Sequence, residues 1–395
     1  KRGRETGGKK SLATHVVLRG RNMTGNDRKK KITIPIFVPH KGCPNDCVFC
    51  NQRKITGMTE EMTVSRAKAT IEEFLSEKRE DAFYEIAFFG GSFTAISDAR
   101  RVELLQLAHQ YILSGEVKSI RISTRPDAID EMILEELQQY GVQVIELGVQ
   151  SLDERVLQES NRGHDAECVY RSAKLIQDYG FQLGLQMMIG LPFDSEETVW
   201  FTANEFVNIR PDMVRIYPTL VVEDTKLATW MKEGKYQPLS LEQAVEQAKK
   251  CKVLFACHDI PVIRMGLQAT TEIQDGSSVL AGPFHPAFGE MVYSAVYQDF
   301  LEEKYLWRKE EEQRELMFYG RLLEDDTVVK VTVPKRQVSR WIGNHASVKK
   351  YFQKKYSVSL QITGEPRETV RLYGREYTEK GIFEIVFQKY EEEKE

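Results

Sequence analysis

Three cysteines within eight residues, in the stretch CPNDCVFC, are the side chains of this chain best suited to metal chemistry. Iron–sulfur clusters are held by cysteine thiolates, and a cubane cluster tied on every iron takes four of them. The spacing of Cys43, Cys47 and Cys50 can hold three thiolates around one cluster, and no fourth cysteine stands nearby. The pattern therefore indicates a cluster with one metal position left open for another ligand.

Other interpretations of these cysteines are a zinc site, a disulfide with one free thiol, or a turn without metal. A structural zinc ion usually takes four protein ligands, often as two CxxC pairs, and the second pair is absent here. His40, three residues before the first cysteine, could still complete a zinc site. The remaining cysteines, Cys168, Cys251 and Cys257, fall in helical patterns and are interpreted as buried apolar thiols.

The loop resembles the CxxxCxxC loop of radical S-adenosylmethionine (SAM) enzymes, whose aromatic position is Phe49 here. In that family the loop holds a 4Fe-4S cluster with one open iron, and SAM fills the open position. An electron from the cluster then cleaves SAM to a 5′-deoxyadenosyl radical. The resemblance implies that Cys43, Cys47 and Cys50 are metal ligands, that Phe49 contributes to cofactor binding, and that flavodoxin or ferredoxin acts as electron donor.

The elements that must position this loop alternate along the first half of the chain. Strands are predicted at Thr33–Pro39, Glu85–Phe89, Ser119–Ser123, Val144–Val149, Leu183–Ile189 and Met213–Tyr217, and helices at Val64–Lys78, Ala99–Leu113, Ile129–Tyr140, Ala166–Tyr179 and Glu196–Asn208. Strands separated by helices form parallel βαβ units with right-handed crossovers. The sequence thus predicts an α/β fold, a partial (β/α)6 barrel with a smaller C-terminal α+β domain. A further strand, Ile260–Met265, is expected to extend the sheet.

Five consecutive predicted strands end in unusual sequences. These are the cysteine loop, Gly90–Phe93, Ser123–Asp127, Gln150–Ser151 and Ile189–Pro192. In parallel α/β folds, ligands bind at the carboxyl ends of the strands. The coincidence predicts one active site at this edge of the sheet.

Small and polar residues at two of these strand ends are candidate cofactor ligands. Gly90, Gly91 and Ser92 would let the backbone approach a ligand closely, and radical SAM enzymes use such a turn for the methionine amino group of SAM. The alternative is an ordinary tight βα turn. Ser123 and Arg125 offer a hydroxyl for a ribose and a guanidinium for a carboxylate, or else helix capping and a surface ion pair.

The segment ELGVQSLDERVLQESNRGH resembles radical SAM proteins related to the Elongator catalytic subunit and to oxygen-independent coproporphyrinogen oxidase. Carried over by position, the resemblance assigns SAM contacts to Gln150 and Arg162. It also assigns one to Gln186, where the porphyrin-pathway relatives carry a ribose-binding Asp. With STRPD and IYPTLVVEDTKL, the likeness to the Elongator family covers residues 33 to 290. Two departures are the compact cysteine spacing and the lack of an acetyl-CoA loop after residue 290.

Other polar residues near the expected pocket are Arg215, Tyr217, Arg264, Gln268 and His285, each more simply explained as structural. No Ser-His-Asp, HExxH or Walker pattern is present in the sequence.

The C-terminal stretch VPKRQVSRWIGNHASVKKYFQKKYSVSLQIT resembles the core of a KH domain, with strand, helix, glycine loop, helix and strand. KH domains clamp a nucleic-acid backbone with a GXXG loop, whereas the loop here, Gly343 to Ala346, lacks the second glycine. Basic residues that would suit phosphates are Lys335, Arg336, Arg340, Lys349, Lys350, Lys354 and Lys355. The alternative is an amphipathic helix with a basic exposed face.

Composition bounds these interpretations. The chain has 395 residues, 41% of them hydrophobic, and no apolar run approaches the roughly 18 residues of a membrane helix. We therefore expect the protein to be in the cytoplasm, where thiolates stay reduced. Residues 1–31 carry a net charge of +9, which leaves −13 for the rest of the chain. This composition predicts a disordered tail, and Met23 is a candidate for the natural first residue. The expected domains are 1–31, 32–292 for the barrel, 293–326 for a helical connector and 327–395.

Three functions fit the sequence. The first is a radical SAM enzyme acting on an RNA nucleoside, in tRNA. The second keeps the same cofactors but takes a small molecule, as the porphyrin-pathway relatives do. The third is an RNA-binding protein whose cluster is structural.

Overall fold

The computed structural model describes residues 30–38, 47–51, 62–267, 278–319 and 327–392. Their main sheet has seven strands in the order β1-β2-β3-β4-β5-β6-β8, and every neighbouring pair is parallel. The strands are β1 (Lys30–Val38), β2 (Ala82–Gly90), β3 (Ser119–Thr124), β4 (Val142–Gln150), β5 (Gln182–Ile189), β6 (Met213–Pro218) and β8 (Val262–Met265). The α/β half-barrel is confirmed. The expected (β/α)6 barrel has six strands, and β8 adds a seventh parallel strand to them.

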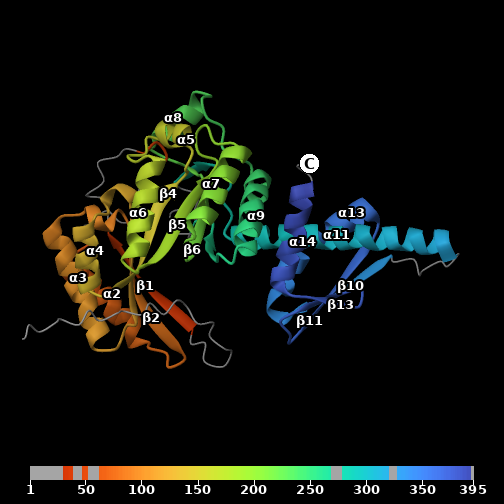
Figure 1. Cartoon of the computed structure of the whole chain (residues 1–395), viewed down its shortest axis with the longest axis horizontal. Helices are drawn as coiled ribbons and strands as arrows, with labels where there is room; N and C mark the ends of the chain where they lie inside the picture. The colour runs from red at the N-terminus through yellow and green to blue at the C-terminus, as the bar shows by residue number, and fades with distance from the viewer. Residues whose placement is uncertain (1–29, 39–46, 52–61, 268–277, 320–326, 393–395) are drawn as a thin grey trace, which may run out of the picture.

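Helices connect the strands and cover one face of the sheet (Figure 1). They are α2 (Val64–Ser76), α3 (Asp98–Leu113), α4 (Glu131–Gln139), α5 (Glu154–Glu159), α6 (Ala166–Asp178), α7 (Glu196–Ile209), α8 (Lys226–Lys232) and α9 (Leu241–Cys257), with short 3-10 turns η1 (Phe93–Ala95) and η2 (Pro126–Ala128). A small antiparallel pair, β7 (Val221–Val222) and β9 (Val279–Ala281), lies after β6. No described helix is both long and apolar enough to cross a bilayer.

Polar caps fix where most of these helices begin. The side chains of Thr63, Asp130, Asp153, Asp165, Ser195, Thr225 and Ser240 each accept a hydrogen bond from the backbone N–H three residues later. Each such cap stabilises a helix by about 1 kcal/mol. The capping box expected at Ser240 and Gln243 is confirmed. The caps hold the helix starts, and therefore the loops that precede them, at the carboxyl edge of the sheet.

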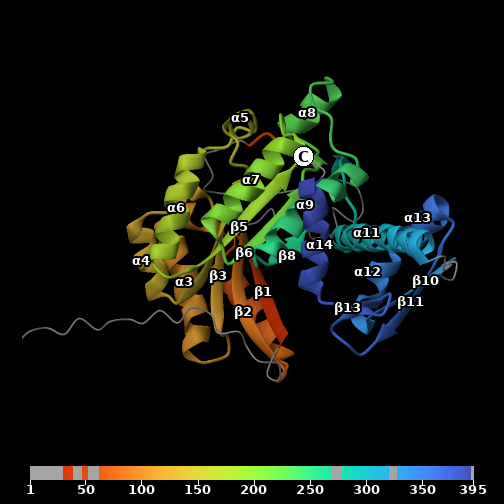
Figure 2. The ribbon, with the colours of Figure 1, turned by 45° about the vertical axis from the view of Figure 1, so that its right-hand side comes forward.

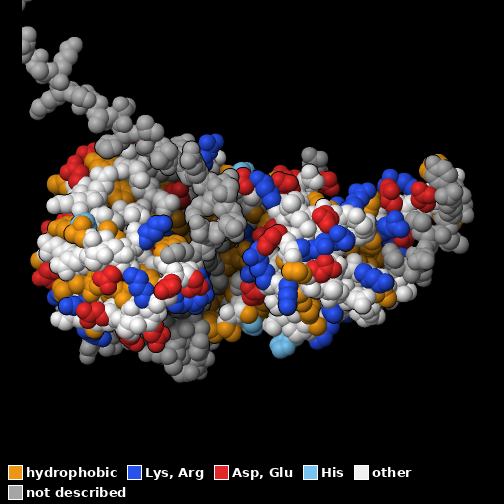
Figure 3. Space-filling view, turned by 90° about the horizontal axis from the view of Figure 1, so that it is seen from below, with side chains coloured by type: hydrophobic (Ala, Val, Ile, Leu, Met, Phe, Trp, Pro, Cys, Tyr) orange, Lys and Arg blue, Asp and Glu red, His pale blue; other side chains and the backbone are white. Residues whose placement is uncertain are grey.

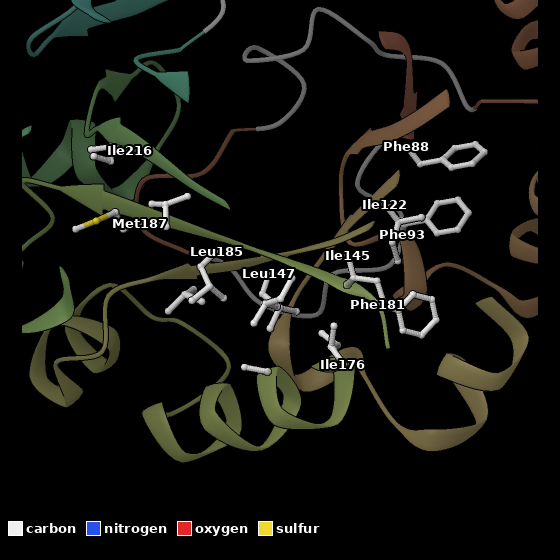
Figure 4. Close-up of a cluster of buried hydrophobic side chains, with 14 of the residues drawn as sticks. Phe88, Phe93, Ile122, Ile145, Leu147, Ile176, Phe181, Leu185, Met187 and Ile216 are labelled. Atoms are coloured by element: carbon white, nitrogen blue, oxygen red, sulfur yellow. The ribbon is translucent and has the colours of Figure 1, made fainter. Parts of the chain in front are cut away.

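The two faces of the sheet differ because alternate strand residues point to opposite sides. On the convex face, apolar side chains pack under the helices to form the main core. Figure 4 shows Ile176 of α6 beneath Ile145 and Leu147 of β4, and all three are fully buried. Each buried aliphatic side chain of this size contributes roughly 1.5–3 kcal/mol to folding. This core makes the sheet a rigid support for the residues on the other face.

The concave face carries a connected set of charges. Glu85 contacts Lys31 and Arg121, and Glu146 contacts Arg121 and Arg215. Burial opposes ionisation of Glu85, but attraction to Arg121 and Lys31 outweighs it and lowers the pKa of this carboxyl. The Glu85 carboxylate therefore remains charged and neutralises the buried guanidinium of Arg121, which also contacts Glu146. The network ties β1, β2, β3, β4 and β6 together across the inside of the half-barrel.

A smaller α+β part follows the barrel. Its elements are α11 (Phe288–Tyr319), β10 (Val328–Pro334), η3 (Lys335–Gln337), α12 (Val338–Ile342), η4 (Asn344–Ala346), α13 (Ser347–Tyr356), β11 (Ser359–Glu365), β12 (Val370–Leu372), β13 (Arg375–Tyr377) and α14 (Glu379–Glu392). The sheet has the order β11-β10-β12-β13. Figures 1 and 2 both place α14 beside α9. Helix α11 joins the parts, because Val292 belongs to the barrel core and Phe300 to the second core.

Candidate functional site

The cysteine loop follows β1, at the carboxyl edge that the parallel strands share. Cys47 and Cys50 are described, whereas Cys43 and the alternative ligand His40 lie outside the described residues. The backbone N–H of Cys50 donates to the carbonyl oxygen of Cys47 over 2.9 Å, so one tight turn carries both thiols. Cys47 is 5% exposed and Cys50 is half-buried. The loop is therefore closed on one side by protein.

Backbone hydrogen bonds tie this loop to distant parts of the chain. The N–H of Val48 donates to the carbonyl oxygen of Ser160 (3.1 Å), and the N–H of Leu227 donates to the carbonyl oxygen of Val48 (2.8 Å). The side-chain amide of Asn51 donates to the carbonyl oxygen of Glu223 (3.0 Å). The loop is thus held by the turn after α5 and by the segment that starts α8. Neither contact is visible from the cysteine spacing.

Phe49, the aromatic residue of the loop, packs sideways into protein. It lies half-buried against a small apolar cluster that includes Val48, Val221, Leu227 and Ala228. This packing adds a hydrophobic anchor to the backbone hydrogen bonds of the loop. The contribution of Phe49 to cofactor binding stays a prediction.

Arg162 lies directly beside the cysteine loop. Its Nη1 is 3.4 Å from the Cys47 sulfur and donates to it, while its Nη2 donates to the carbonyl oxygen of Gly148 over 2.5 Å. Its Nε is buried and has no hydrogen-bond partner among the described residues. The guanidinium therefore bridges the cysteine loop and strand β4, and one of its nitrogens is left for another acceptor.

Gln150 and Gln186 meet at the ends of β4 and β5. The Gln186 side-chain amide donates to Oε1 of Gln150 over 3.2 Å. Gln150 has φ +75° and follows a register shift after Gly148, so a β-bulge turns its side chain. Gln150 is 5% exposed and Gln186 half-buried. The structure thus brings together Cys47, Gln150, Arg162 and Gln186, although their roles as ligands stay predictions.

Gly148 is a site residue that the sequence reasoning missed. A Cβ atom built on it would lie 3.0 Å from Nε2 of Gln150 and 3.8 Å from Nη2 of Arg162. Its carbonyl oxygen accepts from Arg162. A side chain at position 148 would press on the Gln150 amide, so glycine lets Gln150 lie close to the strand without shifting. A glycine inside an otherwise apolar strand was the signal that could have identified it.

His164, the last residue of the NRGH turn, was also missed. It is 8% exposed, its Nε2 lies 3.3 Å from the carbonyl oxygen of Val149, and its Nδ1 has no partner among the described residues. Burial, with the positive charge of Arg162, lowers the pKa of His164 to about 4. The imidazole is therefore neutral near pH 7 and donates to the strand one residue before Gln150. A histidine next to the arginine of the motif was the available signal.

The glycine turn after β2 closes tightly on β1. Gly90 has φ +104°, and a Cβ atom there would lie 3.0 Å from the carbonyl oxygen of Val38. The N–H of Gly91 donates to the same oxygen over 2.9 Å. Ser92 precedes η1 without capping it through its side chain. The geometry requires glycine at position 90 for the turn itself, and a cofactor role for this turn stays a prediction.

Ser123 and Arg125 point to different surroundings. Ser123 is half-buried on the concave face, in register with Glu146. Arg125 is 8% exposed and pairs with both carboxylate oxygens of Asp127, at 2.8 and 2.9 Å. The expected carboxylate partner of Arg125 is thus supplied two residues later by the chain itself. A contact of either residue with a cofactor stays a prediction.

The remaining pocket candidates have partners within the protein. Arg215 donates from Nη1 to the hydroxyl of Tyr217 (3.2 Å) and lies 5.3 Å from the ring centre of Phe89. Arg264 donates to the carbonyl oxygen of Gly266 over 3.3 Å. Nδ1 of His285 accepts from the N–H of Ala287 (3.0 Å), and Gln268 lies outside the described residues.

The KH-like segment has the expected order of strand, helix, loop, helix and strand, from β10 to β11. In its loop, Gly343, His345 and Ala346 all have positive φ, at 78°, 50° and 59°. The loop therefore takes a left-handed path although it has only one glycine. Nδ2 of Asn344 lies 3.4 Å from Nε2 of His285, so the loop faces the segment that precedes α11.

Three of the seven basic residues are engaged in ion pairs: Arg336 with Glu368, Arg340 with Glu290 and Lys355 with Glu302. The others are Lys335, Lys349, Lys350 and Lys354, all exposed or half-buried. Figure 3 shows blue and red side chains intermingled over the right-hand part of the face in view, to which the C-terminal elements belong. The positive surface is therefore smaller than the sequence predicts.

Comparisons with known proteins match two consecutive regions of the chain. Residues 37–206 match the radical SAM superfamily, and residues 211–298 match the Radical_SAM C-terminal domain. The chain belongs to the radical SAM superfamily and is an enzyme. Its radical SAM region is homologous to that of Elongator complex protein 3 and the tRNA uridine(34) acetyltransferases.

Among these relatives, the tRNA uridine(34) acetyltransferase of Methanocaldococcus jannaschii is 34% identical over 128 residues, which cover 32% of this chain and 24% of that protein. Human Elongator complex protein 3 is 32% identical over 185 residues, covering 41% and 33%. The matched segments thus span a third or less of these two relatives. The solved structure of archaeal Methanocaldococcus infernus Elp3 with an N-terminal deletion has TM-score 0.53 and 22% identity, over 77% of this chain and 70% of that chain, and shows the shared fold.

The described part of the loop suits an iron–sulfur cluster. Two thiols lie on one turn, a guanidinium donates to one of the sulfur atoms, and Nε of Arg162 is buried without a partner among the described residues. No three His, Cys, Asp or Glu side chains of the described residues gather as metal ligands, since Cys43 lies outside them. Thiolates are the donors that such clusters take. The residues therefore fit the cofactors that the superfamily implies.

Proposed function

We propose that this enzyme holds a 4Fe-4S cluster by Cys43, Cys47 and Cys50 and binds SAM beside it, in order to act on a nucleoside of RNA, namely tRNA. The single observation that carries the proposal is the contact chain at the sheet edge. Arg162 contacts both the Cys47 sulfur and Gly148, next to the hydrogen-bonded pair of Gln150 and Gln186. Polar groups for a ligand thus lie beside the cluster loop.

The bound cofactors would supply an electron and a 5′-deoxyadenosyl radical, and the protein supplies position and shielding. The buried turn of Cys47 keeps solvent from one side of the loop. The amide groups of Gln150 and Gln186 can accept hydrogen bonds from the hydroxyls of a nucleoside and can donate hydrogen bonds to them. Neutral His164 holds the strand backbone next to Gln150 without adding charge.

A matched pair of cysteine variants tests the cofactor assignment. Cys47→Ala removes a cluster ligand, whereas Cys257→Ala removes a half-buried thiol at the end of α9. After anaerobic reconstitution, iron content and dithionite-dependent 5′-deoxyadenosine are measured with SAM. Loss of both in Cys47→Ala and wild-type values in Cys257→Ala are expected. Undiminished 5′-deoxyadenosine from Cys47→Ala would contradict the assignment.

The RNA substrate is proposed because the relatives that match are named for tRNA uridine modification. The alternative of a small-molecule substrate predicts that the reconstituted enzyme consumes no nucleoside of tRNA. The test is incubation with SAM, reductant and tRNA purified from a strain that lacks the enzyme, followed by mass analysis of the nucleosides. A new or shifted nucleoside supports the proposal, and unchanged nucleosides beside active SAM cleavage favour the small-molecule alternative.

The alternative of an RNA-binding protein with a structural cluster predicts an intact cluster without SAM cleavage.

The electron donor is proposed to be a low-potential carrier such as flavodoxin or ferredoxin. Replacing dithionite by each reduced carrier in the SAM cleavage assay tests this proposal. A cytoplasmic location likewise stays a prediction.

Phosphate contacts in the C-terminal part are assigned to Lys335, Lys349, Lys350 and Lys354. The other three basic residues are in ion pairs with glutamates, which already offset the charge of those three residues.

A further inference from the structure

The guanidinium of Arg162 has a contact that the family resemblance does not assign to it. The resemblance gives Arg162 to SAM, whereas in the structure Nη1 donates to the sulfur of Cys47 over 3.4 Å. This distance is normal for a hydrogen bond to sulfur, which is a larger acceptor than oxygen. The arginine therefore contacts a ligand atom of the proposed cluster directly.

Arg162 is held in this place from both ends. Its backbone N–H donates to the carbonyl oxygen of Leu157 (2.9 Å), and its Nη2 donates to the carbonyl oxygen of Gly148. The same turn also holds the cysteine loop, since the carbonyl oxygen of Ser160 accepts from the N–H of Val48 over 3.1 Å. A long side chain fixed at its backbone and at its tip loses little freedom when it donates to sulfur. The contact with Cys47 is thus built into the turn.

We propose that Arg162 raises the reduction potential of the cluster through its hydrogen bond to the Cys47 thiolate. Reduction adds one electron, taken from flavodoxin, ferredoxin or dithionite, to a cluster already surrounded by negative thiolates. A positive N–H donor at a thiolate stabilises the more negative reduced form more than the oxidised form, and hydrogen bonds to sulfur are known to set such potentials. No proton moves, because arginine stays protonated. Arg162 is in this sense a positioning and tuning residue.

This inference rests on the proposed function, because it needs a cluster at Cys47. It is tested on the SAM-free protein, so that any contact of Arg162 with SAM does not contribute. The reduction potential of the reconstituted protein is measured by redox titration followed by electron paramagnetic resonance, for wild type, Arg162→Lys, Arg162→Gln and Arg155→Gln. Arg155 is a matched control, because it is an exposed arginine on α5 whose guanidinium lies over the ring of Phe193 (4.5 Å).

Arg162→Gln should lower the equilibrium constant for reduction about tenfold, a shift of about 59 mV to more negative potential for a one-electron couple. Arg162→Lys keeps the charge but not the planar fork and should shift the potential less. Arg155→Gln removes the same charge farther from the loop and should leave the potential unchanged. An unchanged potential in Arg162→Gln, or equal shifts in Arg162→Gln and Arg155→Gln, would overturn the inference.

A second measurement does not depend on how well the Gln variant folds. Wild-type protein labelled with 15N-arginine is reduced and examined by pulsed electron paramagnetic resonance. A 15N coupling to the cluster, lost or altered in labelled Arg162→Lys, is expected, and its absence from the wild type would overturn the inference. Failure of the wild type to take up any cluster would instead refute the proposed function, whereas a cluster that does not sense Arg162 refutes only this inference.

Discussion

Replacing His164 by Gln should remove a pH dependence of folding that the wild-type protein shows below neutrality. Burial and the nearby Arg162 lower the pKa of His164 to about 4 in the fold, whereas an unfolded histidine titrates near 6.5. The unfolded chain therefore takes up the proton first as pH falls. The contribution of neutral His164 is fully present above pH 6.5 and is lost as pH falls to about 4. Linkage gives a loss of about 2 kcal/mol between pH 7 and pH 5.

The assay is urea unfolding of wild type and His164→Gln from pH 8 to pH 4.5, followed by circular dichroism. Glutamine can still donate to the carbonyl oxygen of Val149 but does not titrate, so it keeps the contact and removes the proton. The difference in unfolding free energy between the two proteins should stay constant above pH 7 and shift by about 2 kcal/mol in favour of the variant at pH 5. A difference that is the same at pH 7 and pH 5 would refute the reasoning about His164.

Three further substitutions test other parts of the structure. Gly90→Ala should destabilise folding by about 1–3 kcal/mol, because alanine is strained at φ +104° and its Cβ would press on the Val38 carbonyl; an unchanged urea midpoint would contradict this. Glu146→Gln leaves buried Arg121 and half-buried Arg215 short of a carboxylate and should destabilise folding by about 3–5 kcal/mol in the same measurement, whereas an unchanged urea midpoint would show that water screens the network. Lys349→Glu with Lys350→Glu should weaken tRNA binding and reduce the slope of log affinity against log salt by about 2; an unchanged slope would exclude phosphate contacts there.

The strand and helix pattern was predictable because local periodicity reports the apolar face of each element. Each expected strand of the barrel overlaps an observed strand, and the strand ends with unusual sequences gather at one edge as expected. Parallel strands separated by helices leave few other topologies. The position of Cys47 and Gln150 at the same edge followed from this topology.

Contacts between distant residues were not predictable from patterns. Arg340 and Lys355 look like phosphate ligands in sequence, but Glu290 and Glu302, about fifty positions away, pair with them. The contact of Arg162 with the Cys47 sulfur spans more than a hundred residues. This contact depends on how the turn after α5 packs on the cysteine loop, which no local pattern encodes.

Glycine positions show a second limit. Gly90 was identified because it stands in a Gly-Gly pair, whereas Gly148 lies alone within an apolar strand. The reason for glycine at position 148 is visible only in the fold, where the side chains of Gln150 and Arg162 lie beside its Cα atom. A single glycine in a strand has several explanations. In this structure the explanation is the close approach of neighbouring side chains to the strand.

We propose that the cluster has one iron open to SAM. The most direct measurement is electron paramagnetic resonance of the reduced, reconstituted wild-type protein with and without SAM, on samples whose iron content is known. We expect about four iron atoms per chain and a signal that changes when SAM binds the open iron. Bound zinc in place of iron, or a cluster signal that SAM leaves unchanged, would contradict it.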